Sequence, residues 1–229
     1  MIRGNGLQVY ENLGSFSDSD LANLLWSSAA LGHRNLALLD HLLASKQEDL
    51  RRCSPDSLHL VIWSLEKLGY VPSRAWVQAF LDALQPTLFQ LTPAQMVDIV
   101  WALARLGVTV PTPWLDQFLT VAQWRLPNFN ATLLSTVGWS VATLGHRPSQ
   151  EWVLCYEDQM RKNFLSFSAP ELACTAWALQ RFGSQDKHNA VFCMLYSQQF
   201  FLDVDPEVLE NSKLMSQILQ WWNVTGRGT

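Results

Sequence analysis

Apolar and polar residues along this chain follow a helical pattern that recurs about every 38 residues. In each recurrence, a stretch of about fourteen residues carries apolar side chains at spacings of three and four and ends in Gly, as in PAQMVDIVWALARLG at 93–107. This spacing is typical of an amphipathic α-helix. The pattern therefore predicts an α-helix, roughly 21 Å long, at the start of every recurrence.

A tryptophan occupies the same place in each of these predicted helices. Aligning the chain on it gives LLWSSAALG, VIWSLEKLG, IVWALARLG, VGWSVATLG and TAWALQRFG, with spacings of 37, 38, 38 and 38 residues. Self-similarity at a fixed period of this length is the signature of a repeat protein. The markers are Trp26, Trp63, Trp101, Trp139 and Trp177, and each is followed six residues later by Gly32, Gly69, Gly107, Gly145 or Gly183.

Residues that start and stop helices lie at matching places in each repeat. Gly at the end of the first helix can adopt the left-handed conformation that stops a helix. Nine residues before each marker Trp stands a residue whose side-chain oxygen can accept a hydrogen bond from an unpaired backbone N–H. These predicted N-caps are Ser17, Ser54, Thr92, Asn130 and Ser168.

A second helix is predicted after each Pro-containing turn, because Pro cannot continue the first helix but can begin another. The candidate segments read AWVQAFLDALQPTLF at 75–89, PWLDQFLTVAQWRL at 113–126 and EWVLCYEDQMRKNFL at 151–165. A second Trp recurs in them thirteen residues after the first, at Trp76, Trp114 and Trp152, with Leu39 and Ala190 at the equivalent places of the outer repeats. Each repeat is therefore expected to be a helical hairpin.

Hairpins of this kind bury their apolar faces only by stacking on their neighbours, which predicts an all-α fold, an α-solenoid of about five 38-residue repeats. Residues 1–16 are expected to be the second helix of a partial N-terminal repeat, and 205–229 a C-terminal capping helix and tail. The five repeats are assigned to 17–53, 54–91, 92–129, 130–167 and 168–204.

The marker Trp residues lie on the opposite side of the helical wheel from the steadily apolar positions. A helix that is apolar on two sides is expected to pack both within its hairpin and against the next repeat, which makes these Trp residues structural repeat markers. The alternative is a platform for stacking nucleobases. Trp is the same in every repeat, so it cannot by itself distinguish one base from another.

Positions seven and three residues before the marker Trp, and four residues after it, share its side of the wheel and vary between repeats. Such variation is what a protein that reads one base per repeat requires, and it is equally typical of a solvated helix face. We add Arg147, a cation in the turn that follows Gly145. The candidate RNA-binding residues are therefore Asn23, Lys67, Asp98, Arg105, Thr136, Arg147 and Arg181.

The amino-acid composition argues against several classes of function. Lys and Arg number 16 against 20 acidic residues, which gives a formal net charge of −4. This charge argues against a protein that binds a nucleic-acid duplex through its overall positive charge.

Four Cys and five His form no pair at ligand spacing, so we expect no metal, no cofactor, no catalytic residues and no enzyme activity. No apolar run approaches the roughly 20 residues that span a bilayer, so no membrane partner is expected. The N-terminal residues lack the features of an organelle transit peptide.

The period, the W[AS]LxxLG-like end of the first helix and the Pro-rich run into a second Trp, as in VTVPTPW at 108–114 and RPSQEW at 147–152, resemble octotricopeptide repeats. The resemblance covers residues 16–201 and is most specific in the three central repeats. It implies an RNA-binding helical-repeat protein of a mitochondrion or chloroplast. The partners that it implies are messenger or ribosomal RNA, with organelle ribosomal or other ribonucleoprotein subunits. A structural component of an organelle ribosome fits this short array, and a scaffold that docks a protein partner is the alternative.

Overall fold

The computed structural model describes residues 17–163 and 166–183, and every regular element in these ranges is helical. The all-α prediction is therefore confirmed for this part of the chain. The predicted N-terminal segment 1–16, the second helix of the fifth repeat and the capping helix at 205–229 lie outside the described residues. The chain divides into two compact units, one ending at Ala122 and the other beginning at Gln123, and each is described by itself.

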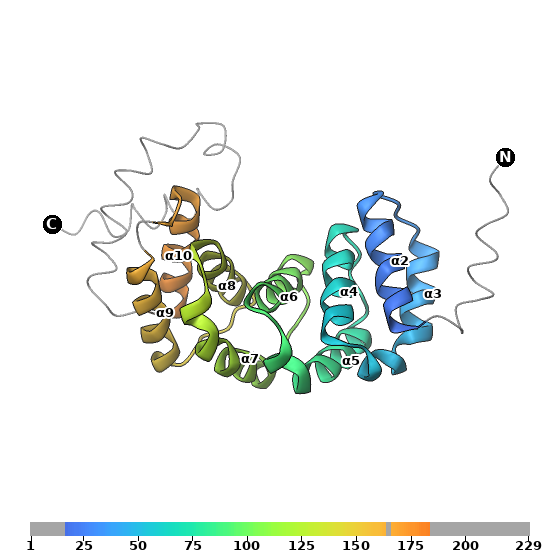
Figure 1. The fold of residues 1–229 in the computed structure, drawn as a ribbon, viewed down its shortest axis with the longest axis horizontal. Coiled ribbons are helices and arrows are strands. Elements are labelled where there is room, and N and C mark those ends of the chain that lie inside the picture. Colours follow the sequence, from blue (N-terminus) through green and yellow to red (C-terminus); the bar gives the residue numbers. More distant parts are fainter. Residues whose placement is uncertain (1–16, 164–165, 184–229) are drawn as a thin grey trace. The chain divides into compact units, whose positions relative to one another are not determined.

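The described part of the first unit, from residue 17 on, contains three helical hairpins (Figure 1). Its three first helices lie side by side, with α4 packed against α2 on one side and α6 on the other. The unit boundary falls in the last turn of α7. The first helices are α2 (Asp18–Ala30), α4 (Pro55–Lys67) and α6 (Pro93–Leu106), and the second helices are α3 (Leu36–Lys46), α5 (Arg74–Leu84) and α7 (Thr112–Arg125).

The second unit repeats this arrangement. Its first helix α8 (Ala131–Thr143) packs against the next first helix, α10 (Ala169–Phe182), and also contacts its own second helix, α9 (Gln150–Lys162). The short 3-10 turn η4 (Leu126–Asn128) precedes α8 and contacts α9.

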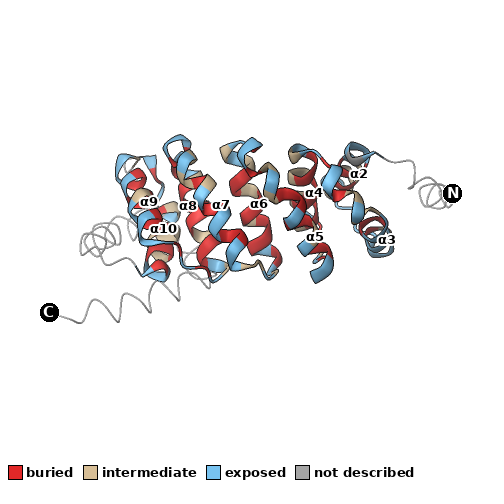
Figure 2. Cartoon of the chain, turned by 90° about the horizontal axis from the view of Figure 1, so that it is seen from below, coloured by how far each residue is buried: buried red, intermediate tan, exposed pale blue. Residues whose placement is uncertain are grey.

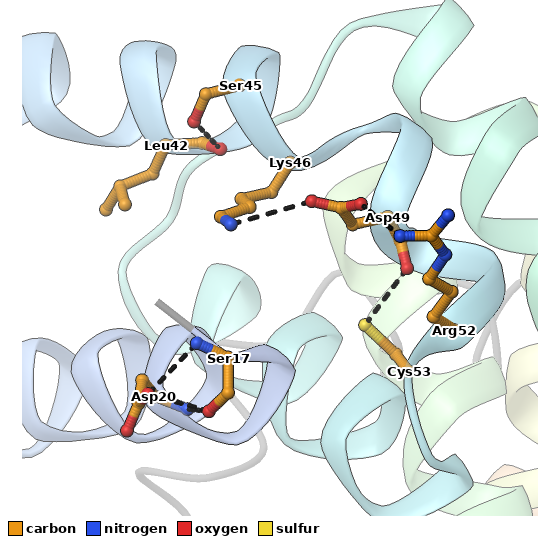
Figure 3. A network of polar contacts seen from close by, with 8 residues as sticks. All are labelled: Ser17, Asp20, Leu42, Ser45, Lys46, Asp49, Arg52 and Cys53. Atoms are coloured by element: carbon orange, nitrogen blue, oxygen red, sulfur yellow. Dashed lines mark hydrogen bonds and ion pairs between the residues drawn. The ribbon is translucent and has the colours of Figure 1, made fainter. Parts of the chain in front are cut away.

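The predicted starts and ends of the first helices are confirmed. Each predicted N-cap residue is the N-cap of its helix. In α2 the cap is reciprocal, since Ser17 Oγ accepts the Asp20 N–H at 3.2 Å while Asp20 Oδ2 accepts the Ser17 N–H at 3.0 Å (Figure 3). At the other end, all five marker glycines have left-handed backbones, with φ between 60° and 76°. The Gly107 N–H donates to Ala104 O, which satisfies a carbonyl in the last turn of α6.

The predicted length of the second helices was wrong in part. α5 ends at Leu84, five residues before the predicted end at Phe89, and the chain continues as the 3-10 turn η3 (Gln85–Gln90). Pro86 has no N–H to donate, so the α-helical hydrogen-bond ladder cannot run through it. A similar turn, η2 (Glu48–Arg52), follows α3, and α9 ends at Lys162, before its predicted end at 165.

The second-helix tryptophans belong to the core, and Figure 2 shows that buried and exposed residues share the helices of both units. Trp76, Trp114 and Trp152 are buried, and each stacks on the aromatic ring four residues later, with ring centroids 5.0–5.6 Å apart. The Trp114 Nε1–H also donates to Leu81 O of α5 at 3.0 Å, which joins consecutive second helices. These residues are therefore part of the core, and Trp114 also connects two consecutive second helices.

Candidate nucleic-acid-binding surface

We call the side of the first helices that carries the marker tryptophans the first-helix face. It comprises the marker Trp and the positions seven and three residues before it and four residues after it. The opposite side, with Met96, Ile99 and Leu103 in α6, is buried. On the first-helix face Trp26 is 47% exposed, and the other four marker Trp residues are half-buried. The marker tryptophans thus lie at the surface, whereas the second-helix tryptophans form the core.

Cations lie over the rings of three marker tryptophans. Each comes from the residue four positions later in the same helix, which is the neighbouring position on a helix surface. Lys67 Nζ is 5.4 Å from the Trp63 ring centroid, and Arg105 Cζ is 5.9 Å from that of Trp101. In the second unit, Arg181 Cζ lies 5.3 Å from the Trp177 ring. The equivalent positions of the first and fourth repeats hold Ala30 and Thr143.

Lys67 also links two consecutive first helices. Its Nζ lies 4.8 Å from the Trp101 ring of α6, closer than to the Trp of its own helix. Beside it, Glu66 Oε1 accepts a hydrogen bond from Arg105 Nε at 3.2 Å, and Glu66 Oε2 lies 3.4 Å from Lys67 Nζ. One carboxylate therefore holds the cations of two helices against one indole.

Polar contacts between neighbouring first helices join residues 39 positions apart, one more than the repeat period. In the first unit, Gln95 Nε2 donates to Asp56 Oδ1 at 2.6 Å and His59 Nε2 lies 3.1 Å from Asp98 Oδ2. The same relation joins Thr132 to Glu171 at 2.6 Å in the second unit. Residues on the variable positions are thus bound to the adjacent repeat as well as facing the surface.

Comparison with known protein families shows to which family this chain belongs. The family model described as the Tbc2 translation factor, N-terminal domain, matches residues 7–116 and, in a second match, residues 36–182. The chain belongs to this family. The two matches overlap over residues 36–116, which is what an internally repeated sequence allows. No curated protein matches the chain.

The predicted RNA-binding residues of this family member occupy different environments. Lys67, Arg105 and Arg181 belong to the Trp–cation contacts described above, and Asn23 and Arg147 are exposed. Asp98 is half-buried against His59, and the Thr136 hydroxyl donates to Thr132 O of its own helix at 2.7 Å.

At the position equivalent to Asp98 in the fifth repeat stands Cys174. Burial raises the pKa of its thiol to about 11, and the nearby Glu171 carboxylate adds to this, so the group is a neutral thiol at neutral pH.

Sequence reasoning missed Glu66 and His59, because they lie one position outside the variable set. The sequence nevertheless contains a signal for both residues, because a residue that can pair with each lies 39 positions later. That residue is Arg105 for Glu66 and Asp98 for His59. A search for complementary residues at the period plus one would have found both contacts.

Within residues 17–163 and 166–183, no group of three or more His, Cys, Asp or Glu side chains is placed to hold a metal ion. No helix in these ranges is long and apolar enough to cross a membrane. On the first-helix face the described residues offer cations over aromatic rings, together with the carboxylates of Asp56 and Asp98.

Proposed function

We propose that this chain is a non-catalytic RNA-binding protein that acts in translation within a mitochondrion or chloroplast. We further propose that its hairpins are octotricopeptide repeats that stack into an α-solenoid. Membership in the family of a translation factor domain supports a role in translation. The recurrence of hairpins with the same caps, and the two overlapping family matches, support the repeat assignment.

The observation that carries this proposal is the recurrence of a cation over a marker Trp on the exposed side of the first helices. A cation over an indole is attracted by about 0.5–1 kcal/mol at exposed sites. The side chain is therefore partly fixed before an anion arrives, which reduces the entropy lost on binding. Cations held at a repeated position are suited to a polyanion with repeated charges, such as an RNA backbone.

The overall charge of −4 restricts where RNA can bind. Affinity for nucleic acid rests largely on Lys and Arg at phosphates, and an acidic chain repels RNA over most of its surface. The Trp–cation contacts therefore favour binding confined to the first-helix face. Binding of this kind fits contact with messenger RNA or with a segment of ribosomal RNA, and it fits a structural subunit of an organelle ribosome.

A mobility-shift assay with single-stranded RNA tests the proposal. The variant Lys67→Met/Arg105→Met/Arg181→Met removes the three cations from the first-helix face. We expect it to bind at least tenfold more weakly than wild type, since contacts of ionised groups contribute about 1.5–3 kcal/mol each.

The matched control is Arg52→Met/Arg74→Met/Lys162→Met, which removes the same charge from exposed residues outside the first-helix face. These three residues lie in or after second helices. Among them, Arg52 Nη1 lies 3.7 Å from Asp49 Oδ1, and Figure 3 shows the two side chains next to each other. Equal loss of affinity in the two triple variants would contradict a localised RNA surface.

A protein scaffold is the second candidate, favoured by exposed apolar side chains on the second helices. Trp124 in α7 is 83% exposed and Leu154 in α9 is 52% exposed. Exposed aromatic residues often anchor protein partners. If the chain is a scaffold, Trp124→Ser will release it from ribonucleoprotein particles in sedimentation, while the first-helix triple variant will remain bound.

A further inference from the structure

We infer that Lys67 and Arg105 together bind a backbone phosphate of RNA, and that Glu66 is the positioning residue that holds them in place. In this site Trp101 supports the two cations and does not stack a base. The inference rests on the proposed RNA-binding function and specifies the ligand group at one junction, between α4 and α6.

Burial and charge distinguish Glu66 from an ordinary surface acid. Its side chain is only 7% exposed, whereas Lys67 is 41% and Arg105 is 56% exposed. A buried carboxylate is stable when it is paired. Here Oε1 accepts the Arg105 Nε–H, whereas Oε2 accepts no hydrogen bond from any described residue and is paired only by charge with Lys67 Nζ, 3.4 Å away. The carboxylate therefore faces inward while its two partners extend outward from it.

The two cations keep donors available for a ligand. Arg has five N–H donors and Lys three, and the contacts with Glu66 use the Arg105 Nε–H and one side of the Lys67 ammonium. The sum of two positive charges and one negative charge is +1, which matches the single negative charge of a phosphodiester. Charge-assisted contacts to phosphate are the strong class of hydrogen bond.

The cations also occupy space that a stacked base would need. Aromatic rings stack with centroids about 4.5–7 Å apart. Lys67 Nζ and Arg105 Cζ lie 4.8 Å and 5.9 Å from the Trp101 centroid, within the same range. A base could stack on a face covered by either cation only by displacing it and breaking its contact with Glu66. The arrangement therefore favours phosphate over base at this ring.

The variant Glu66→Gln distinguishes two effects of Glu66 on RNA binding, namely holding Lys67 and Arg105 in place and lowering the net charge of the site. Bulk charge alone predicts tighter RNA binding, because the variant removes a negative charge beside the phosphate site. Positioning predicts weaker binding, because Lys67 and Arg105 lose the carboxylate that holds them. We expect a loss on the order of tenfold, the equivalent of one charge-assisted hydrogen bond.

Arg105→Lys provides a second test that keeps the charge. Lys cannot reproduce the guanidinium fork that contacts Glu66 through Nε while presenting other donors to a ligand. We expect RNA binding to weaken in this variant as well, whereas a bulk-charge surface would be unaffected. The control Asp82→Asn removes one negative charge from an exposed position of α5 and should not weaken binding.

The experiment measures the affinity of the full chain and its variants for a single-stranded RNA oligonucleotide and for an abasic oligonucleotide of equal length. Circular dichroism melting confirms that each variant is folded. The inference predicts that Glu66→Gln and Arg105→Lys weaken binding to both probes by similar factors. It is overturned if Glu66→Gln binds as tightly as wild type or more tightly, or if these variants change binding only to the probe that carries bases. If wild type binds neither probe, the proposed function falls together with the inference.

Discussion

At the scale of single residues, Gly138 and Tyr156 show how one repeat departs from its neighbours. In the second and third repeats the equivalent pairs are Ile62 with Phe80 and Val100 with Phe118. In the fourth, the Tyr156 hydroxyl lies 2.2 Å from where a Cβ on Gly138 would stand, and it donates to Leu134 O at 2.7 Å. Burial raises the pKa of Tyr156, so the hydroxyl keeps its proton. The larger second-helix residue thus requires the smaller first-helix residue.

This complementarity predicts a non-additive pair of substitutions. Gly138→Ala should lower the free energy of unfolding by about 1–3 kcal/mol, since the new methyl group overlaps the hydroxyl. Tyr156→Phe removes that oxygen and recreates the Phe of the neighbouring repeats. The double variant should therefore lose less stability than the sum of the single variants, with a coupling of about 0.5–3 kcal/mol. Urea denaturation of the four proteins measures this, and strictly additive losses would show that the two residues do not conflict.

At the scale of helices, Glu171 joins α10 both to its own cap and to the preceding first helix. Its carboxylate accepts hydrogen bonds from the Ser168 N–H at 2.8 Å and from the Thr132 hydroxyl of α8 at 2.6 Å. Partial burial alone would raise the pKa of Glu171, but these hydrogen bonds outweigh it and lower the pKa from its ordinary value of 4.5. The ionised form is therefore favoured in the folded state.

A pKa lower in the folded than in the unfolded state gives a defined pH dependence. The stabilisation is fully present above the ordinary carboxyl pKa and is lost as the pH falls through the folded-state value. We expect the melting temperature of wild type to fall more steeply than that of Glu171→Gln when the pH is lowered from about 5 to 3, where glutamate titrates. Parallel melting curves for the two proteins across this range would contradict the assignment.

The limits of sequence reasoning also lie at the scale of helices. First-helix boundaries could be predicted because capping is local, as at Thr92 and Gly107. The end of α5 was missed because the apolar pattern continues past Pro86, and the prediction followed that pattern instead of the break that proline makes in the hydrogen-bond ladder. A helical wheel predicts which side of α6 carries Arg105, but not which residue of the adjacent helix Arg105 contacts. Its contact with Glu66 depends on a one-residue offset between packed helices, which a wheel drawn for one helix does not contain.

At the scale of the molecule, the repeat positions separate into structural and surface roles. Second-helix tryptophans such as Trp114 build the core, while first-helix tryptophans such as Trp101 lie half-buried beneath cations. Cations over marker tryptophans are found in both compact units, at Lys67, Arg105 and Arg181. The proposed RNA binding through this repeated feature should therefore appear as several phosphate contacts in one complex.

The salt dependence of RNA binding distinguishes binding through phosphates from other kinds of binding. For single-stranded nucleic acid, the slope of log K against log salt concentration is about −0.7 for each phosphate contact. Wild type should bind with a clearly negative slope, and Lys67→Met/Arg105→Met/Arg181→Met should show a slope that is shallower by about 1.4, for one phosphate lost at Lys67 and Arg105 and one at Arg181. No binding at low salt, or the same slope in wild type and the triple variant, would contradict the central claim that the first-helix face binds RNA through its phosphates.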